Sequence, residues 1–163
     1  MSLLARKINR NNWNLEATTV SDLSADAITQ CMKTIDNSMS TYEIASEAEI
    51  DQAFLAIAAN FSELETFDIL LLDKQCIIDK GLTCEQNSGN TPVQNLVNTH
   101  WDIINLNYGN LGTCAWYMLE RFKLQKVVRR TKLELKQIIK KAINDNILDP
   151  TDLKDKVQRE IQK

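Results

Sequence analysis

The sequence predicts an α/β domain, with an α+β arrangement as the alternative, and three observations support this prediction. A nearly continuous apolar run at 67–72 has the length and composition of a strand that is buried on both faces. It follows an amphipathic pattern at 50–58, which is typical of a helix that covers a sheet. The chain has 163 residues, of which 44% are hydrophobic, so it can bury one continuous core. We therefore expect a single domain built on a mixed sheet.

The N-terminal third is expected to supply the first strands of that sheet. Residues 3–8 predict a strand, which leads into a polar segment. The segments 27–34 and 39–44 flank an Asp-Asn dipeptide that suits a tight turn, and together they predict an N-terminal β-hairpin. A helix over 26–33 is the competing interpretation of the first arm.

Helix-initiation signals predict the helices that cover the sheet. Ser46 with Glu49, and Thr131 with Glu134, have the spacing of a capping box, in which each side chain accepts an amide proton at the helix start. The Thr-Pro pair at 91–92 offers an N-cap followed by a first-turn proline. The expected elements are covering helices at 47–60, 92–101 and 109–122, a polar loop at 84–90, a short strand at 103–106 and a C-terminal basic helical hairpin.

The net charge of −3 conceals a division along the chain. Residues 121–163 contain 13 Lys and Arg against 6 Asp and Glu, which leaves 6 basic and 16 acidic residues in 1–120. Charge asymmetry of this kind bears on partners and association rates, not on the fold itself. We expect residues 1–122 to form the α/β core and 123–163 to form a basic helical extension.

The basic segment is the main candidate for a binding surface. Clustered cations can neutralise phosphates and release counterions, as nucleic-acid-binding proteins do. The aromatic residues that would stack single-stranded bases are missing from the segment, apart from Phe122. The same cations could form a solvated helix face, or dock onto an acidic surface of this chain or of a partner. The predicted binding residues are Arg121, Lys126, Arg129, Arg130, Lys132, Lys136, Lys140 and Lys141.

Two adjacent aromatic residues, Trp116 and Tyr117, are a second candidate for an interface. Neighbouring side chains on a helix point about 100° apart, so both are hard to bury in one small core. Trp and Tyr are favoured at interaction hot spots, and a homodimer through these residues is one outcome. The alternative is a helix that is buried on two sides.

No catalytic, metal-binding or cofactor-binding residues are predicted. The single histidine, His100, precedes Asp102 by two residues, which is the wrong spacing for contact on the expected helix, and Cys114 lacks a nucleophile signature. The cysteines contain no Cys-x-x-Cys pair, so a structural zinc site is excluded. Asp68 and Asp73 bracket the apolar run and would be the Mg²⁺ ligands of a nuclease, a third interpretation.

These observations favour a non-catalytic protein that docks a protein partner through charged faces, such as a bacterial accessory, antitoxin-like or immunity-like protein. Nucleic-acid binding through the basic C-terminal helices is the alternative, and a metal-dependent nuclease or other hydrolase follows. No stretch approaches the roughly 20 apolar residues of a membrane span. The N-terminus lacks the apolar region of a secretion signal, so we expect a cytoplasmic protein without membrane partners.

Overall fold

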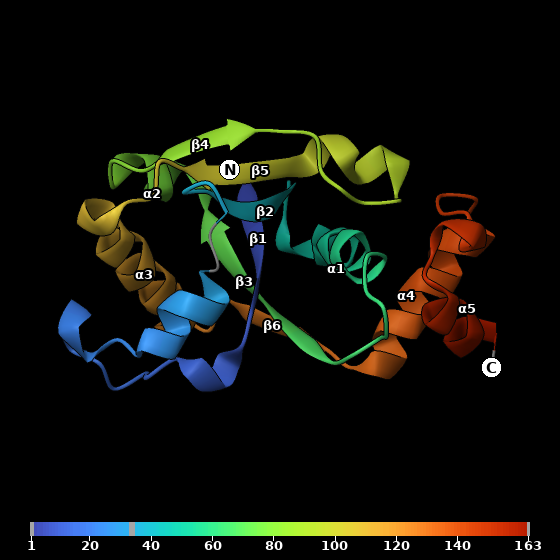
Figure 1. Ribbon diagram of the computed structural model, residues 1–163, viewed down its shortest axis with the longest axis horizontal. Coiled ribbons are helices and arrows are strands. Elements are labelled where there is room, and N and C mark those ends of the chain that lie inside the picture. Colours follow the sequence, from blue (N-terminus) through green and yellow to red (C-terminus); the bar gives the residue numbers. More distant parts are fainter. Residues whose placement is uncertain (1, 33–34, 163) are drawn as a thin grey trace.

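A six-stranded sheet with helices on both faces forms the centre of the computed structural model, which describes residues 2–32 and 35–162 (Figure 1). The α/β class is therefore confirmed. The strands are β1 (Leu3–Ile8), β2 (Met39–Ile44), β3 (Phe67–Asp73), β4 (Thr83–Gln86), β5 (His100–Ile104) and β6 (Val127–Arg130). Their order in the sheet is β4-β5-β2-β1-β3-β6, so β4 and β6 are the two edges.

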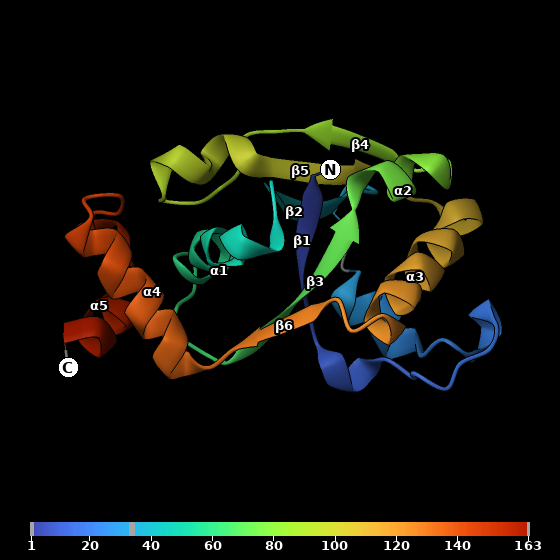
Figure 2. The ribbon, with the colours of Figure 1, turned by 180° about the vertical axis from the view of Figure 1, so that it is seen from behind.

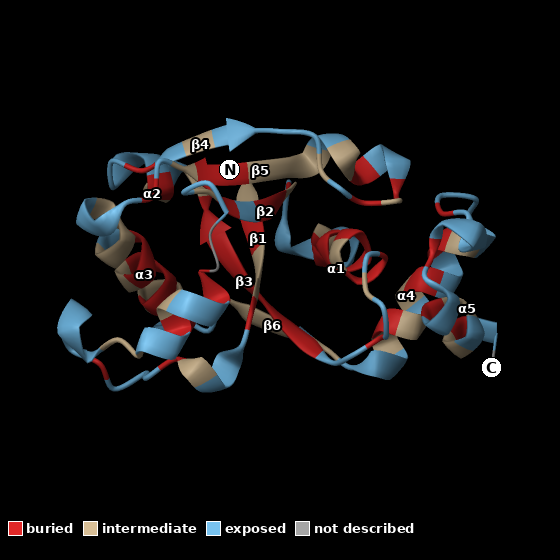
Figure 3. Cartoon of the chain, viewed as in Figure 1, coloured by how far each residue is buried: buried red, intermediate tan, exposed pale blue. Residues whose placement is uncertain are grey.

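All strand pairings in this sheet are antiparallel, whereas a mixed sheet was expected. β3 pairs with β1 on one side and with β6 on the other, and every one of its residues is buried, as Figure 3 shows. Continuous burial of this kind is typical of strands in parallel sheets. Here the same apolar run arises because helices cover both faces of an antiparallel sheet.

Three helices cover one face of the sheet: α1 (Ile50–Ala58), α4 (Lys132–Asn144) and α5 (Asp155–Gln162). Leu71 of β3 lies in the core that they form, together with Phe54 of α1 and Ile139 of α4. All three side chains are fully buried. The apolar positions of each helix recur every three or four residues, so one stripe of each faces the sheet.

The opposite face is covered by α3 (Tyr108–Lys123), α2 (Lys74–Asp79) and the π-helix η3 (Ala27–Cys31). Figure 2 shows α3 and α1 on opposite sides of the central strands. Leu70 and Leu72 point to this second core because side chains alternate along β3.

Within the described ranges, no helix is both long and apolar enough to cross a membrane. Short 3-10 helices complete the fold: η1 (Arg10–Asn12), η2 (Val20–Asp22), η4 (Glu47–Glu49), η5 (Gln94–Thr99) and η6 (Pro150–Asp152).

The predicted N-terminal hairpin is wrong in its first arm. Ala27–Cys31 is helical, as the competing interpretation held, because the buried Ala27 and Cys31 lie four residues apart on one helix face. Residues 33–34 of that arm lie outside the described residues. The predicted tight turn is present, since Asp36 and Asn37 both have left-handed φ angles, of 53° and 59°. Its second arm is β2, which pairs with β1 and β5.

Two predictions for the middle of the chain are corrected by the sheet. The helix expected at 92–101 is only the 3-10 segment η5, because from His100 the chain extends and pairs with β2 as β5. The polar loop expected at 84–90 begins inside β4, which pairs with β5 at the edge of the sheet. A solvated edge strand contains polar residues, so its sequence resembles that of a loop.

The C-terminal region is joined to the core by a strand that was not predicted. Val127–Arg130 forms β6 and pairs with β3, so part of the expected helical extension belongs to the sheet. The capping box at the start of α4 is confirmed: Thr131 Oγ1 accepts from the Glu134 amide at 3.3 Å, and the Glu134 carboxylate accepts from the Thr131 amide at 2.7 Å.

We expect Leu71→Ala to lower the free energy of unfolding by about 2–5 kcal/mol, because Leu71 is fully buried beside α1 and the substitution leaves a cavity. Leu133→Ala makes the same chemical change at a side chain that is 65% exposed, and should alter stability by less than about 0.5 kcal/mol. Urea denaturation of the two variants measures the difference. Equal losses would contradict the assignment of β3 to the centre of the core.

Candidate functional site

Four of the eight predicted binding cations make close ion pairs with acidic residues of the same chain, and a fifth, Arg129, makes a longer one. Docking of the basic segment onto an acidic surface of its own chain describes only Lys126 and Arg130, which pair with the N-terminal part. Lys132 instead joins α4 to α5, and Lys141 pairs with the residue that follows α4. Arg121 instead donates from Nε to the Leu71 carbonyl at 2.8 Å. The pairs are Lys126–Glu47 at 2.8 Å, Arg130–Asp51 at 2.9 Å, Lys132–Glu160 at 3.0 Å and Lys141–Asp145.

Three predicted cations are left more available. Arg129 is 55% exposed, and its Nη1 lies 3.5 Å from Asp68 Oδ2, a long contact. Lys136 and Lys140 on α4 have no ion-pair partner among the described residues. Arg129 lies at one end of the sheet and the two lysines lie on α4, so the structure does not gather the eight predicted residues into one surface.

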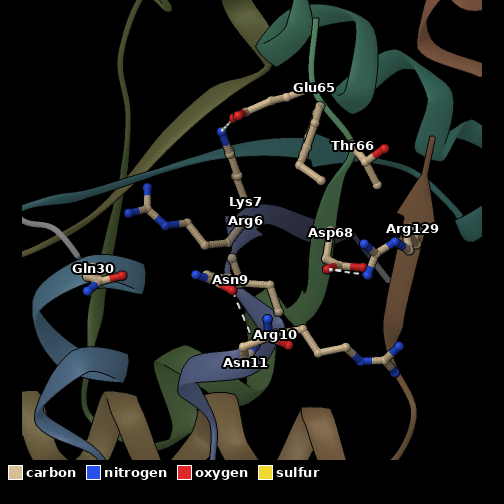
Figure 4. A pocket seen from close by; sticks show the side chains of 12 residues that line it. Arg6, Lys7, Asn9, Arg10, Asn11, Gln30, Glu65, Thr66, Asp68 and Arg129 are labelled. Atoms are coloured by element: carbon tan, nitrogen blue, oxygen red, sulfur yellow. Dashed lines mark hydrogen bonds and ion pairs between the residues drawn. The ribbon is translucent and has the colours of Figure 1, made fainter. Parts of the chain in front are cut away.

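Arg129 lines a cleft of about 590 Å³ at the end of the sheet where β1 ends and β3 begins. We call it the sheet-end cleft. Residues 6–11 and 65–68 form its walls, with Gln30 from η3 and Arg129 from β6 (Figure 4). Its lining is polar and carries both signs of charge, which suits a ligand that offers both hydrogen-bond acceptors and donors.

Asp68 is the most unusual residue of the sheet-end cleft. Its side chain is only 7% exposed, and the long contact with Arg129 is made by Oδ2. The other oxygen, Oδ1, is buried and has no hydrogen-bond partner among the described residues. Buried carboxylate oxygens are normally hydrogen-bonded, because an unmade bond in a buried site is costly. The wall of the cleft therefore contains a buried carboxylate oxygen whose hydrogen-bonding capacity is unused.

Arg10 is the exposed cation of the sheet-end cleft that is not engaged in the described ion pairs. Its guanidinium lies 6.0 Å from the ring of Phe122, and Figure 4 shows its side chain extending toward β6, on the same side as Arg129. Lys7, by contrast, binds Glu65 at 2.8 Å. Arg10 and Arg129 together make a positive site beside the buried carboxylate, and two guanidinium groups suit a carboxylate or phosphate ligand.

Arg6 has a structural role at the back of the sheet-end cleft. Its guanidinium donates to the Cys31 carbonyl from Nε and Nη2 at 3.0 and 2.9 Å, and to the Ser40 carbonyl from Nη1 at 2.7 Å. Burial lowers the pKa of Arg6 to about 10, so the group stays charged at neutral pH. These bonds fasten η3, which carries Gln30, to the sheet.

A second depression, which we call the β6 hollow, adjoins the cleft. It has a volume of about 480 Å³ and shares Arg10 with the sheet-end cleft. Phe122 of α3 and Val127 of β6 provide apolar surface in it, and Leu15 is an exposed apolar residue at its edge. The β6 hollow therefore places an apolar surface next to the cationic one. Its remaining lining residues are Lys123 and Gln125.

The structure does not assemble a thiol catalytic site. His100 and Asp102 lie on a strand rather than on the expected helix, so they share a face, with 3.8 Å between His100 Nε2 and Asp102 Oδ1. His100 packs against Tyr42 in the α1 core. Cys114 lies in the α3 core, on the opposite face, and burial raises the pKa of its thiol to about 12. Cys114 therefore does not face the histidine.

The two aspartates of the nuclease interpretation are also apart. Asp68 and Asp73 lie near opposite ends of β3, separated by roughly 17 Å for five residues of strand. Asp73 caps α2, where its Oδ1 accepts from the Cys76 amide at 3.1 Å. No group of three or more potential metal ligands is found in the part of the chain that the structure describes. One Mg²⁺ cannot bridge the two carboxylates.

The two predicted interface aromatics have different environments. Tyr117 is buried, and its hydroxyl accepts from the Asp73 amide at 2.9 Å and donates to the Asp73 carbonyl at 3.2 Å. Burial raises its pKa to about 12. Trp116 is half-buried, with the Lys123 ammonium 5.7 Å from its ring. Tyr117 therefore fixes α3 to the start of α2, and Tyr108 is fully exposed instead.

The sequence reasoning missed most of the sheet-end cleft. Its N-terminal contributors, Arg6 to Asn11, were treated only as a strand with a polar exit, and Gln30 was placed in a hairpin. The available signal was the cluster of Arg, Lys and Asn residues directly after the first strand.

No family model, curated protein or solved structure matches this chain.

We expect Tyr117→Phe to destabilise the protein by about 1–3 kcal/mol, because the buried Asp73 amide and carbonyl lose the hydroxyl that satisfies them. Tyr108→Phe removes the same atom from a fully exposed ring and should have almost no effect. Thermal and urea unfolding of both variants checks the expectation. A neutral Tyr117→Phe would show that the hydroxyl does not anchor α3.

Proposed function

We propose that this protein is a non-catalytic binding protein that docks an acidic segment of a protein partner in the sheet-end cleft. The observation that carries the proposal is the juxtaposition of two exposed guanidinium groups, Arg10 and Arg129, with the buried and half-unpartnered carboxylate of Asp68. Guanidinium groups bind carboxylates with paired hydrogen bonds. A bacterial antitoxin-like, immunity-like or other accessory protein would use such a site.

Asp68 favours a polypeptide over a nucleic-acid backbone. The phosphate and sugar groups of DNA are hydrogen-bond acceptors, so they would place negative charge beside the Asp68 carboxylate without donating to it. An acidic peptide brings carboxylates for the two arginines, and its amide and hydroxyl groups are donors that are compatible with the nearby Asp68 carboxylate. Four of the other predicted cations are paired with acidic residues within the chain, which further reduces the surface available to phosphates.

The proposed setting is the cytoplasm. All four cysteines are free thiols, which suits a reducing compartment. Arg129, which belongs to the set of binding residues predicted from the sequence, is retained in the proposal. Lys136 and Lys140 are the α4 lysines without an ion-pair partner among the described residues, so substituting them tests the nucleic-acid alternative.

A fluorescein-labelled peptide rich in Glu and Thr should bind the wild-type protein, and the double variant Arg10→Ala/Arg129→Ala should bind it about tenfold more weakly or worse. The matched control, Lys136→Ala/Lys140→Ala, removes the same charge from α4 and should retain binding. Fluorescence anisotropy at two salt concentrations measures both.

The same titration with labelled single-stranded DNA separates the alternative. DNA binding that is lost in Lys136→Ala/Lys140→Ala, together with no binding of the acidic peptide, would overturn the proposal in favour of nucleic-acid recognition. Equal weakening by both double variants would also contradict it, because net charge alone would then explain the affinity.

A further inference from the structure

β6 is an edge strand with an outer side that has no neighbouring strand in the sheet. The Leu71 amide donates to the Lys126 carbonyl at 2.8 Å, so Lys126 takes a hydrogen-bonded position opposite β3. Hydrogen-bonded and non-hydrogen-bonded positions alternate along an antiparallel pair. The peptide groups of Val128 and Arg130 therefore face β3, whereas those of Val127 and Arg129 face outward.

The same two residues border the two depressions. Val127 lines the β6 hollow and Arg129 lines the sheet-end cleft, and Arg10 is common to both. Two residues apart on one strand, Val127 and Arg129 present their side chains on the same face, about 6–7 Å from each other. A strand paired with β6 would place every second side chain over this face, first at one depression and then at the other.

We propose that the partner's acidic segment binds as an added β-strand on the outer edge of β6, antiparallel to it, with the order acidic–any–apolar from its N-terminus. This inference rests on the proposed function and specifies its partner. The acidic side chain lies opposite Arg129, within reach of the sheet-end cleft, and the apolar one lies opposite Val127 at the β6 hollow. Main-chain bonds supply affinity in this mode of recognition, and the alternate side chains supply specificity.

Charge complementarity selects this occupant over a second copy of the chain. A twofold β6–β6 pairing would bring Arg129 of both copies onto two short paired strands, and like charges on opposed strands are unfavourable. An acidic strand meets Arg129 with the opposite sign. Antiparallel addition continues the pattern of the sheet, in which all the strand pairs are antiparallel.

The first test uses a panel of acetylated and amidated peptides in a Thr-rich background, each with one Glu and one Leu. The two residues are placed one, two or three positions apart, in both orders, and binding is followed by fluorescence anisotropy. Glu-x-Leu should bind about tenfold more tightly than the other spacings and than Leu-x-Glu, because only that arrangement serves both depressions at once. Affinity that follows charge alone, regardless of spacing, would overturn the inference.

The second test removes the outward amide of β6. Val127→Pro deletes that N–H but leaves the bonds to β3, since proline is tolerated where the N–H of an edge strand faces away from its neighbour. It should weaken Glu-x-Leu binding about tenfold, whereas Val127→Ala, which retains the amide, should have a smaller effect. Circular dichroism confirms that both variants fold.

If Val127→Pro does not fold, the main-chain hydrogen bonds to β6 can be tested by modifying the peptide instead. Methylation of the Leu amide nitrogen in Glu-x-Leu blocks its bond to β6 and should abolish binding, whereas methylation of the central residue, which faces away from β6, should be tolerated. Tolerance of both would overturn strand addition. Loss of binding in Arg10→Ala/Arg129→Ala with no effect of either amide change would leave the cleft function standing and refute only the strand.

Discussion

The rest of the structure depends on the burial of β3 on both of its faces. Leu70 and Leu72 point into one core and Ile69 and Leu71 into the other, so each helical layer packs against the same strand. A strand with no solvated face cannot shift by one residue without exchanging its two cores, which fixes its register against its neighbours. The positions of Asp68 and Arg129, which are paired across β3 and β6, follow from that register.

The predictable parts of the fold are those in which local pattern and tertiary environment agree. The sequence predicts the apolar run of β3, the amphipathic stripe of α1 and the Thr131 cap of α4. The elements that were missed, β4 and β6, depend on which neighbouring strand each segment finds. Edge strands are short and polar, so their sequences carry little periodicity, and tertiary pairing decides their structure.

The candidate site was harder to predict than the fold because it is assembled from distant segments. Arg10, Asp68 and Arg129 come from three parts of the chain that only the strand order brings together. The charge count located the basic region correctly, but it could not show that Lys126 and Arg130 would find acidic partners at Glu47 and Asp51. The net charge of a segment counts its charged residues, whereas ion pairing depends on where the fold places them.

The position of β6 and α4 after the other five strands also has a consequence for folding during synthesis. β6 and α4 follow every other strand of the sheet along the chain, yet they close one edge of β3 and cover the α1 core. While the ribosome is still adding residues beyond 122, the acidic part of the chain therefore has an open sheet edge, an uncovered apolar face and no basic region to offset its charge. Exposed apolar surface and an unpaired strand edge favour aggregation until residues 123–163 have been added.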